Sequence, residues 1–352
     1  MGNKRGLKKK TGAYYLVNAV LTAVLFTVFF LLISGRTLNN YWSGIVVLVC
    51  INVILAVSLN LVTGILGQLV LGHAGFMLVG AYAAANFTRA FVTNGSMSLY
   101  AALPVAMLIG GLVAAVFGVV IGIPALRLKG DYLAIITLGF GEIIRVMANA
   151  EFLQPITNGA MGLSVKIFSS RTDPGAMFVF AFVVMVLVIF ISYTFGRSRH
   201  GRSVISIRED EIAAEAMGVN TTYYKLFAFV LAAFIAGVAG ALYAHHIGMI
   251  DPAKFDFNRS VEILIMVVLG GMGSISGSVI SATVLTLLPE LLRGFSDYRM
   301  LLYSVILICV MLFRPSGLLG RYEISLPKLA DRLLHRKGKV EKAEKAEKTG
   351  EA

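Results

Sequence analysis

Long apolar runs separated by short polar intervals dominate the chain from Tyr14 to Phe313. Most runs approach twenty residues, the length that a helix needs to cross the hydrocarbon core of a bilayer. They are continuous and not alternating, which argues against a transmembrane β-barrel. The pattern therefore predicts an all-α polytopic membrane protein with about ten transmembrane helices. We expect these spans at 14–34, 42–63, 68–88, 100–125, 131–149, 175–195, 223–248, 260–271, 276–293 and 299–313.

Two of the apolar runs are interrupted by glycine, at GILGQLVLGHAGF (64–76) and VLGGMGSISGSV (268–279). Backbone groups freed by such a break cannot face lipid, so they must lie against protein or a water-filled path. The two breaks occupy corresponding places in two halves of the chain, an arrangement that points to a transport site between repeats. The region 260–293 fits either two short spans or one re-entrant pair, and the sequence leaves this choice open.

Polar side chains near these breaks are candidates for a translocation path. His73 either hydrogen-bonds the freed backbone or is a buried histidine satisfied by a neighbour. Glu142 lies about 16 Å along its span from Asp131, and a carboxylate at mid-membrane is costly enough to suggest a function. Arg145 shares its helical face and offers a structural ion pair instead. The candidate path residues are Gln68, Gly72, His73, Glu142, Gly271 and Gly273.

Composition supports the membrane assignment, because 57% of the residues are hydrophobic and only 14% are charged. Soluble domains carry about a quarter charged residues. The net charge is +12, but the lysines and arginines flank apolar runs, where they orient the protein in the membrane, so nucleic-acid binding is not indicated. Counting these charges places both termini in the cytoplasm and the loops 150–174 and 250–259 outside. We expect a basic N-terminus at 1–13, a permease domain at 14–313 with a cytoplasmic loop at 196–222, and a charged tail at 314–352.

Catalytic and metal-binding patterns are missing from the sequence. Cys50 and Cys309 each lie inside an apolar run, and the adjacent His245 and His246 point to different faces of a helix. Neither pair has the ligand spacing of a metal site. No Walker A, nucleophile-elbow or HExxH motif occurs. The sequence therefore predicts a protein that is not an enzyme and binds no metal or cofactor, so that any ATP chemistry belongs to another chain.

The longest mixed-charge interval between apolar runs is GRSVISIREDEIAAEAMGVN at 201–220. Good helix formers extend over 203–217, Gly218 is a helix stop, and Asn220 or Thr221 is a cap for the next span. The acidic residues do not follow one helical face, so a helix lying on lipid is not indicated. The interval is either a solvated loop helix or a docking site for a soluble partner.

Four stretches resemble a known family: GQLVLGHAGFMLVGAY (67–82), GDYLAIITLGFGEIIRVM (130–147), the stretch 207–244, and VLGGMGSISGSVIS (268–281). They are similar to the permeases of branched-chain amino acid ABC transporters, specifically the LivM-type subunit. The resemblance implies a fold like that of type II ABC importers, in a bacterial inner membrane. It also implies work with a second homologous permease, ABC ATPase subunits and a periplasmic or lipid-anchored substrate-binding protein.

The substrates that the resemblance implies are leucine, isoleucine and valine. The same family covers urea and short-amide permeases, and related families carry sugars. The residues also leave open an ion-coupled secondary transporter that uses Glu142.

The resemblance further implies that 201–220 is the loop on which the ATPase docks. Ala213, Ala214 and Gly218 match the two alanines and the glycine of the EAA loop of binding-protein-dependent permeases. The acid of that pattern corresponds to Ile212, and Glu211 lies one residue earlier. The candidate coupling residues are Glu209, Asp210, Glu211, Ala213, Ala214, Glu215 and Gly218.

Overall fold

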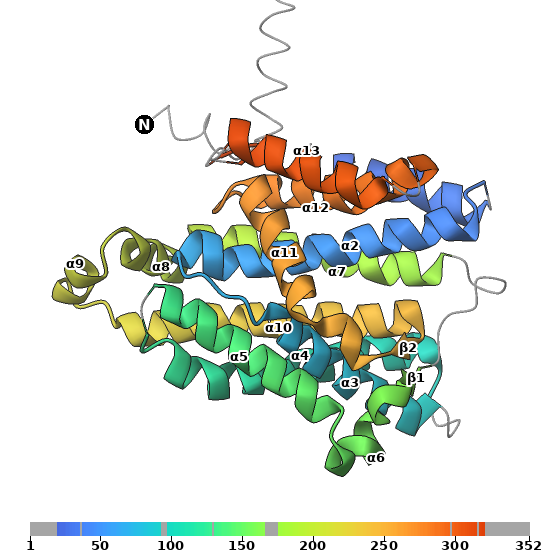
Figure 1. Ribbon diagram of the computed structural model, residues 1–352, viewed down its shortest axis with the longest axis horizontal. Helices are drawn as coiled ribbons and strands as arrows, with labels where there is room; N and C mark the ends of the chain where they lie inside the picture. The colour runs from blue at the N-terminus through green and yellow to red at the C-terminus, as the bar shows by residue number, and fades with distance from the viewer. Residues whose placement is uncertain are drawn as a thin grey trace, which may run out of the picture.

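The computed structural model describes residues 20–35, 37–92, 97–128, 130–165, 175–295, 298–314 and 317–320. The described chain is a bundle of helices, most of which run side by side (Figure 1). The expected basic N-terminus at 1–13 and the charged tail beyond residue 320 lie outside the described residues, as do parts of the loops at 93–96 and 166–174.

Helices make up nearly all of the described chain, and each predicted span coincides with one of them. A first apolar helix covers Val20–Ser34. The remaining elements are α2 (Asn40–Asn60), the π-helix η1 (Leu61–Leu66), α3 (His73–Val92), α4 (Leu99–Ala125), α5 (Asp131–Ala148), η2 (Glu151–Leu153), α6 (Gln154–Thr157), η3 (Gly159–Met161), β1 (Leu163–Ser164), α7 (Ala176–Arg197), α8 (Arg199–Glu209), α9 (Glu211–Ala216), α10 (Thr221–Ile247), β2 (Met249–Ile250), η4 (Pro252–Phe255), α11 (Phe257–Gly270), α12 (Ile275–Leu291), η5 (Leu292–Phe295) and α13 (Arg299–Phe313).

Five helices in the described part of the chain are long and apolar enough to cross a membrane. They are Asn40–Leu66, α4, α7, α10 and Ile275–Gly294. A sixth is added if α5 and Glu151–Met161, which meet at an angle of 68°, form one bent span. The structure thus shows an all-helical membrane protein with five to six candidate spans. The expected count of ten crossings stays a prediction, since Val20–Ser34, α3, α11 and α13 are not among these candidate spans.

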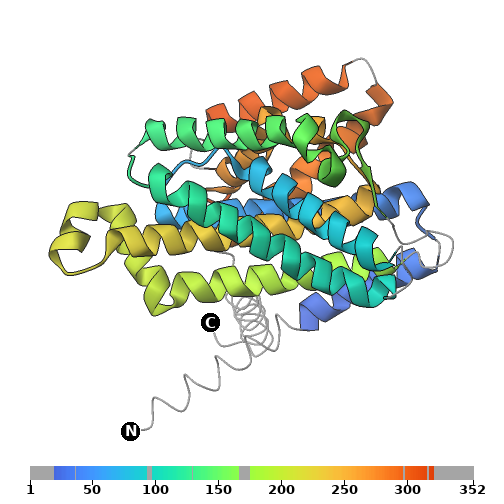
Figure 2. The same ribbon diagram turned by 90° about the horizontal axis from the view of Figure 1, so that it is seen from below.

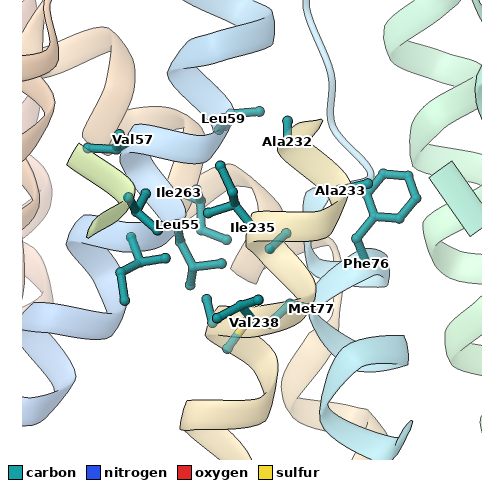
Figure 3. Packing of buried hydrophobic residues seen from close by; sticks show 14 of the residues in the cluster. Leu55, Val57, Leu59, Phe76, Met77, Ala232, Ala233, Ile235, Val238 and Ile263 are labelled. Carbon is teal, nitrogen blue, oxygen red and sulfur yellow. The ribbon is translucent and has the colours of Figure 1, made fainter. Parts of the chain in front are cut away.

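Helix α10 lies at the centre of the bundle and packs against α2, α3 and α4. Figure 3 shows the apolar core where α2, α3 and α10 meet, with Leu55 and Leu59 facing Ile235, and Met77 close to Val238. These side chains are buried because α10 has neighbours on most of its sides. This burial fixes the helices that carry the two glycine breaks relative to one another.

Glycines allow α3, α4 and α10 to approach one another at backbone distance, as small residues do between membrane helices. A Cβ at Gly110 would lie 2.7 Å from the carbonyl oxygen of Gly80, and one at Gly237 would lie 2.6 Å from the carbonyl oxygen of Gly110. A Cβ at Gly240 would collide with the carbonyl of Met77. The small residues of the predicted span 100–125 therefore serve helix contacts.

A pair of short strands was not indicated by the sequence. Residues 163–164 and 249–250 form a two-stranded antiparallel pair, with Leu163 opposite Ile250 and Ser164 opposite Met249. The sequence predicts both regions as loop only. Their pairing depends on residues far apart in the chain, which no local pattern reveals.

Candidate functional site

The first break comprises η1 and the non-helical stretch 67–72. Helix α2 passes into the π-helix Leu61–Leu66, which ends at Gly67 with a φ of 79°, and α3 begins only at His73. Residues 68–72 are therefore not helical, in agreement with the expected irregular start of the span 68–88. Side chains from other helices satisfy the backbone here. Leu71 N donates to Thr137 Oγ1 on α5 at 3.2 Å, and Ala74 N donates to Ser260 Oγ on α11 at 3.2 Å.

The second break comprises Gly271–Ser274 and is a tight turn between α11 and α12. Gly271 and Gly273 have φ values of 107° and 90°, which suit glycine alone. Ser274 caps α12 by accepting from Gly277 N at 3.1 Å. The region 260–293 thus contains two separate helices that pack against each other. The choice between two short spans and a re-entrant pair is left open by this geometry.

The two breaks contact each other, although they are far apart in sequence. Asn60 bridges them, because its Nδ2 donates to the Ser274 carbonyl at 3.1 Å and its Oδ1 accepts from Gly273 N at 2.8 Å. Gly64 packs so closely on the backbone of Gly273 that a Cβ would find no space. Asn60 was missed by the sequence interpretation. Its signal is an amide inside a mainly apolar run, which is costly in a membrane unless it is bonded.

Three candidate path residues lie in or directly after the first break. His73 is buried, and its Nε2 is 2.7 Å from Ser58 Oγ, so it is a histidine satisfied by a neighbour. Gly72 lies against the backbone of Thr137, where a Cβ would collide. Gln68 Oε1 is buried and has no hydrogen-bond partner among the described residues; Thr63 Oγ1 shares this property. Unpaired polar atoms thus collect at the first break.

Glu142 forms an ion pair with Arg145 on α5. Both Nε and Nη2 of Arg145 are 2.7 Å from Glu142 Oε2, and the two side chains are about one third exposed. The neighbouring Gly141 packs against Gly72 and Gly75, so the pair lies beside the first break. The ion-pair interpretation of these two residues describes the observed geometry. A role of Glu142 as a proton or ion relay stays a prediction.

The loop between α7 and α10 extends beyond the end of the bundle as α8 and α9 (Figures 1 and 2). The expectation of one helix over 203–217 is wrong, because the chain breaks at Asp210. The Asp210 side chain accepts from Ala213 N at 3.0 Å and starts α9 as a new helix. The expected ends are confirmed. Gly218 has a φ of 83°, and Asn220 Oδ1 caps α10 by accepting from Tyr223 N at 3.0 Å.

The acidic residues of this loop occupy different environments. Glu211 Oε1 lies 2.8 Å from Nζ of Lys225, a buried lysine on α10. Glu209 pairs with Arg208 at 2.6 Å, and Asp210 serves as the cap. Glu215 is exposed. Three of the four acids thus take part in contacts within the loop or between the loop and the bundle.

Large apolar side chains project from α9 and its end. Ile212 is 77% exposed and Met217 is 85% exposed, whereas Ala214 is buried against the bundle side. Ala213 is exposed beside them. In the sequence Ile212 stands out only as a departure from the EAA-loop pattern, and it was not predicted as a contact residue. Its signal is an aliphatic side chain within a charged stretch.

Arg208 is the third functional candidate that the sequence did not reveal. Its Nη1 donates to the Gly64 carbonyl in η1 at 2.8 Å, and its Nη2 and Nε donate to Glu209. A cavity of about 390 Å³ adjoins it, lined by Ile65, Tyr193, Gly196, Arg197, Ile205, Arg208, Met272, Gly273 and Ile275. Nothing in the sequence distinguishes Arg208 from the other arginines of this loop.

In the part of the chain that the structure describes, no cluster of three or more histidine, cysteine, aspartate or glutamate side chains forms. Cys50 is buried and Cys309 is exposed, and both are free thiols. The site consists of glycine breaks, single polar side chains and a projecting loop. Such an arrangement can guide a solute and transmit movement.

Comparison with known proteins decides the family. Residues 41–313 match the family described as the permease component of branched-chain amino acid transport systems. The chain belongs to this family. It is similar to the high-affinity branched-chain amino acid transport system permease protein LivM of Escherichia coli K12, with 34% identity, covering 90% of this chain and 80% of the relative. LivM of Salmonella typhimurium is 36% identical, covering 76% of this chain and 68% of the relative.

The chain is therefore a multi-pass transport permease of the LivM-like kind and not an enzyme, and it forms the permease component of a branched-chain amino acid ABC transport system. A second permease, LivH of Escherichia coli K12, is 33% identical over 44% of this chain and half of the relative. Escherichia coli thus has two permease proteins of this transport system that both resemble this chain. A permease component works in a heteromeric transporter, together with other subunits.

Proposed function

We propose that this permease imports leucine, isoleucine and valine across a bacterial cytoplasmic membrane. In this proposal both termini and the α8–α9 loop face the cytoplasm, and the chain crosses the membrane ten times. ATP is hydrolysed by separate ATPase subunits, one of which docks on α9. A second homologous permease completes the pathway, and a periplasmic or lipid-anchored binding protein delivers the amino acid at 150–174 and 250–259.

The observation that carries the proposal is the apolar tip of the projecting loop. Ile212 and Met217 are 77% and 85% exposed, on a segment whose other residues are alanine and glutamate. Exposed apolar patches with a polar rim are typical of protein interaction sites. A short helix with such a face fits the groove of a partner.

The loop is also bound to the bundle by an ion pair between α9 and α10. The buried ammonium of Lys225 ties Glu211 of α9 to α10, and removing one partner of a buried ion pair is strongly destabilising because the other charge is left uncompensated. Helix α10 in turn packs against α2, α3 and α4. A displacement of α9 therefore acts on the centre of the bundle, as rigid-body coupling requires.

For the translocation path we propose the region of the two breaks. The residues are Gln68, Gly72, Gly271 and Gly273, with His73 supporting the path through Ser58. Gln68 Oε1, which has no partner within the described ranges of the chain, supports this assignment, since a buried acceptor without a partner is costly unless a solute or water satisfies it.

The test is to assemble this chain with its second permease and ATPase and to introduce Ile212→Asp or Met217→Asp. Loss of a central interface contact costs about 2 kcal/mol or more, which is about thirtyfold in affinity. We expect the ATPase to stop co-purifying and ATP-driven leucine uptake into proteoliposomes to fall accordingly. The matched control is Met161→Asp, because Met161 is 79% exposed but lies in the loop proposed to be external. Undiminished ATPase binding by both α9 variants would contradict the docking site.

The competing function, an ion-coupled secondary transporter, makes an opposite prediction. It requires uptake by the purified chain alone under a proton gradient, with Glu142 essential. Leucine uptake under those conditions, without any ATPase subunit, would overturn the proposal. Competition of leucine uptake by urea, a short amide or a sugar would instead redirect the substrate assignment and leave the ATPase coupling intact.

A further inference from the structure

Arg208 connects the projecting loop to both glycine breaks. It lies on α8, immediately before the turn into α9, and its side chain reaches back to η1. The Gly64 carbonyl that it binds lies in the last turn of η1, where backbone carbonyls lack partners within the helix. Arg208 therefore satisfies a backbone group that the first break has left free.

The contacts continue from Gly64 to the second break. Gly64 packs on the backbone of Gly273, and a Cβ at Gly273 would lie only 3.4 Å from Arg208 Nη1. Asn60 then holds Gly273 N and the Ser274 carbonyl. A continuous series of contacts thus leads from Glu209 through the guanidinium to the backbone of both breaks.

The guanidinium suits this position better than another cation would. Its planar fork donates from Nη1 to Gly64 and from Nη2 and Nε to Glu209 at the same time, whereas an ammonium is a compact charge without this fixed geometry. The stem packs against Gly67, where a Cβ would lie 3.0 Å from Arg208 Cδ. The side chain is therefore held along most of its length.

Space for movement lies directly beside this group. The cavity of about 390 Å³ is bounded by Arg208, by Ile65 of the first break, and by Met272 and Gly273 of the second. Close-packed interiors pass on a displacement instead of absorbing it, but a wall of a cavity can move into the empty volume. Both breaks thus border free volume on this side.

We propose that Arg208 is the positioning residue that transmits a displacement of the α8–α9 loop to the two glycine breaks. The inference rests on the proposed docking of an ATPase on α9. It adds that the two glycine breaks are the part of the permease that moves in response to the docked ATPase. Arg208 does not contact the substrate. It sets the position of the Gly64–Gly273 contact for each position of the loop.

The test uses the complete transporter in lipid with Met272→Cys as a reporter and Cys309→Ala to remove the exposed native thiol. Met272 is exposed and lines the cavity, so its labelling by a membrane-impermeant maleimide reports movement of the second break. Labelling is compared without nucleotide and with ATP plus vanadate. With Arg208 present, we expect the rate to differ several-fold between these states.

Arg208→Gln should abolish this difference while the ATPase still co-purifies. The amount of leucine carried per ATP should fall about tenfold, within the range of typical coupling effects. Arg208→Lys should restore part of the nucleotide-dependent difference in labelling rate and part of the leucine carried per ATP. The control is Arg202→Gln, an exposed arginine on the same helix, which should behave like the parent.

Nucleotide-dependent labelling that persists in Arg208→Gln, with leucine uptake per ATP unchanged, would overturn the proposal. If the Gln variant fails to assemble, the Lys variant decides: parental coupling there would show that charge alone suffices and would overturn the role of the fork. Failure of the docking proposal is distinguishable, because the parent would then show no nucleotide effect on Met272→Cys at all.

Discussion

The first and second breaks differ in where their freed backbone groups find partners. In the first break, Leu71 and Ala74 donate to side chains on α5 and α11, which belong to distant parts of the chain. In the second break, the cap of Ser274 and the glycine turn satisfy part of the backbone from within, and Asn60 on α2 bonds Gly273 N and the Ser274 carbonyl. The first break is therefore held by side chains of distant helices, whereas the second is held partly by its own cap and turn. Asn60 and Gly64 form the contact at which the two meet.

The largest expected effect comes from adding a methyl group at Gly64, where the two breaks meet. In Gly64→Ala the added methyl would meet Asn60 Oδ1 and the backbone of Gly273. We expect a loss of about 3 kcal/mol in the free energy of unfolding, the upper part of the usual range for overpacking. Thermal unfolding in detergent measures it.

The matched control is Gly139→Ala on α5, where nothing lies within 4 Å of the added Cβ. Alanine should stabilise that helix by about 1 kcal/mol. Equal changes in stability for Gly64→Ala and Gly139→Ala would mean that the two breaks are not in close contact.

Replacing the amide that joins the breaks should cost less. Asn60→Leu removes the partners of Gly273 N and the Ser274 carbonyl without a large change in volume. Unpaired buried groups cost about 2 kcal/mol in stability. Asn39→Leu is the control, since Asn39 is exposed and makes no side-chain cap bond. An Asn60→Leu protein as stable as the parent would show that the breaks are held elsewhere.

Two substitutions with smaller expected effects test the two breaks one at a time. Thr137→Val removes the acceptor of Leu71 N, and Ser274→Ala removes the cap of α12; each should cost about 1 kcal/mol. Hydrogen exchange should become faster at Leu71 in the first variant and at Gly277 in the second. Faster exchange at both sites in both variants would indicate a single cooperative unit and remove the distinction between them.

The smallest expected effect belongs to the ion pair beside the first break. Glu142→Gln should change stability by less than about 1 kcal/mol, because partly exposed pairs contribute little. ATP-driven leucine uptake should stay near the parental rate. Arg145→Gln completes a double-mutant cycle for the pair. A tenfold loss of uptake in Glu142→Gln alone would place this carboxylate in the path and make the first break chemically active.

Local patterns predicted much of the fold. The apolar runs located the helices, Gly67 and Gly271 marked the breaks, and Gly218 with Asn220 marked the helix ends at the loop. Such features depend on residues close together in sequence, whose preferences are known. Helix propensity failed at Asp210, because its carboxylate accepts from Ala213 N and favours a cap over continuation.

Contacts between distant residues escaped prediction. Asn60 with Gly273, Arg208 with Gly64, and Lys225 with Glu211 each join segments that have no common local pattern. A lone amide or arginine can be recognised as costly in an apolar setting, but its partner is fixed by helix packing. For the same reason the sequence named Glu211 as a coupling candidate without revealing that its carboxylate is bound to α10.

The strand pair of β1 and β2 has a consequence for the order of assembly. It joins residue 163 to residue 250, and α7, α8, α9 and α10 all lie between them. Closing a loop of this length carries an entropic cost that is recovered only when both ends are in place. The pair can form only after α10 has been synthesised and inserted, so we expect it to be a late event in folding. Its formation would mark a permease whose central helix has reached its final position.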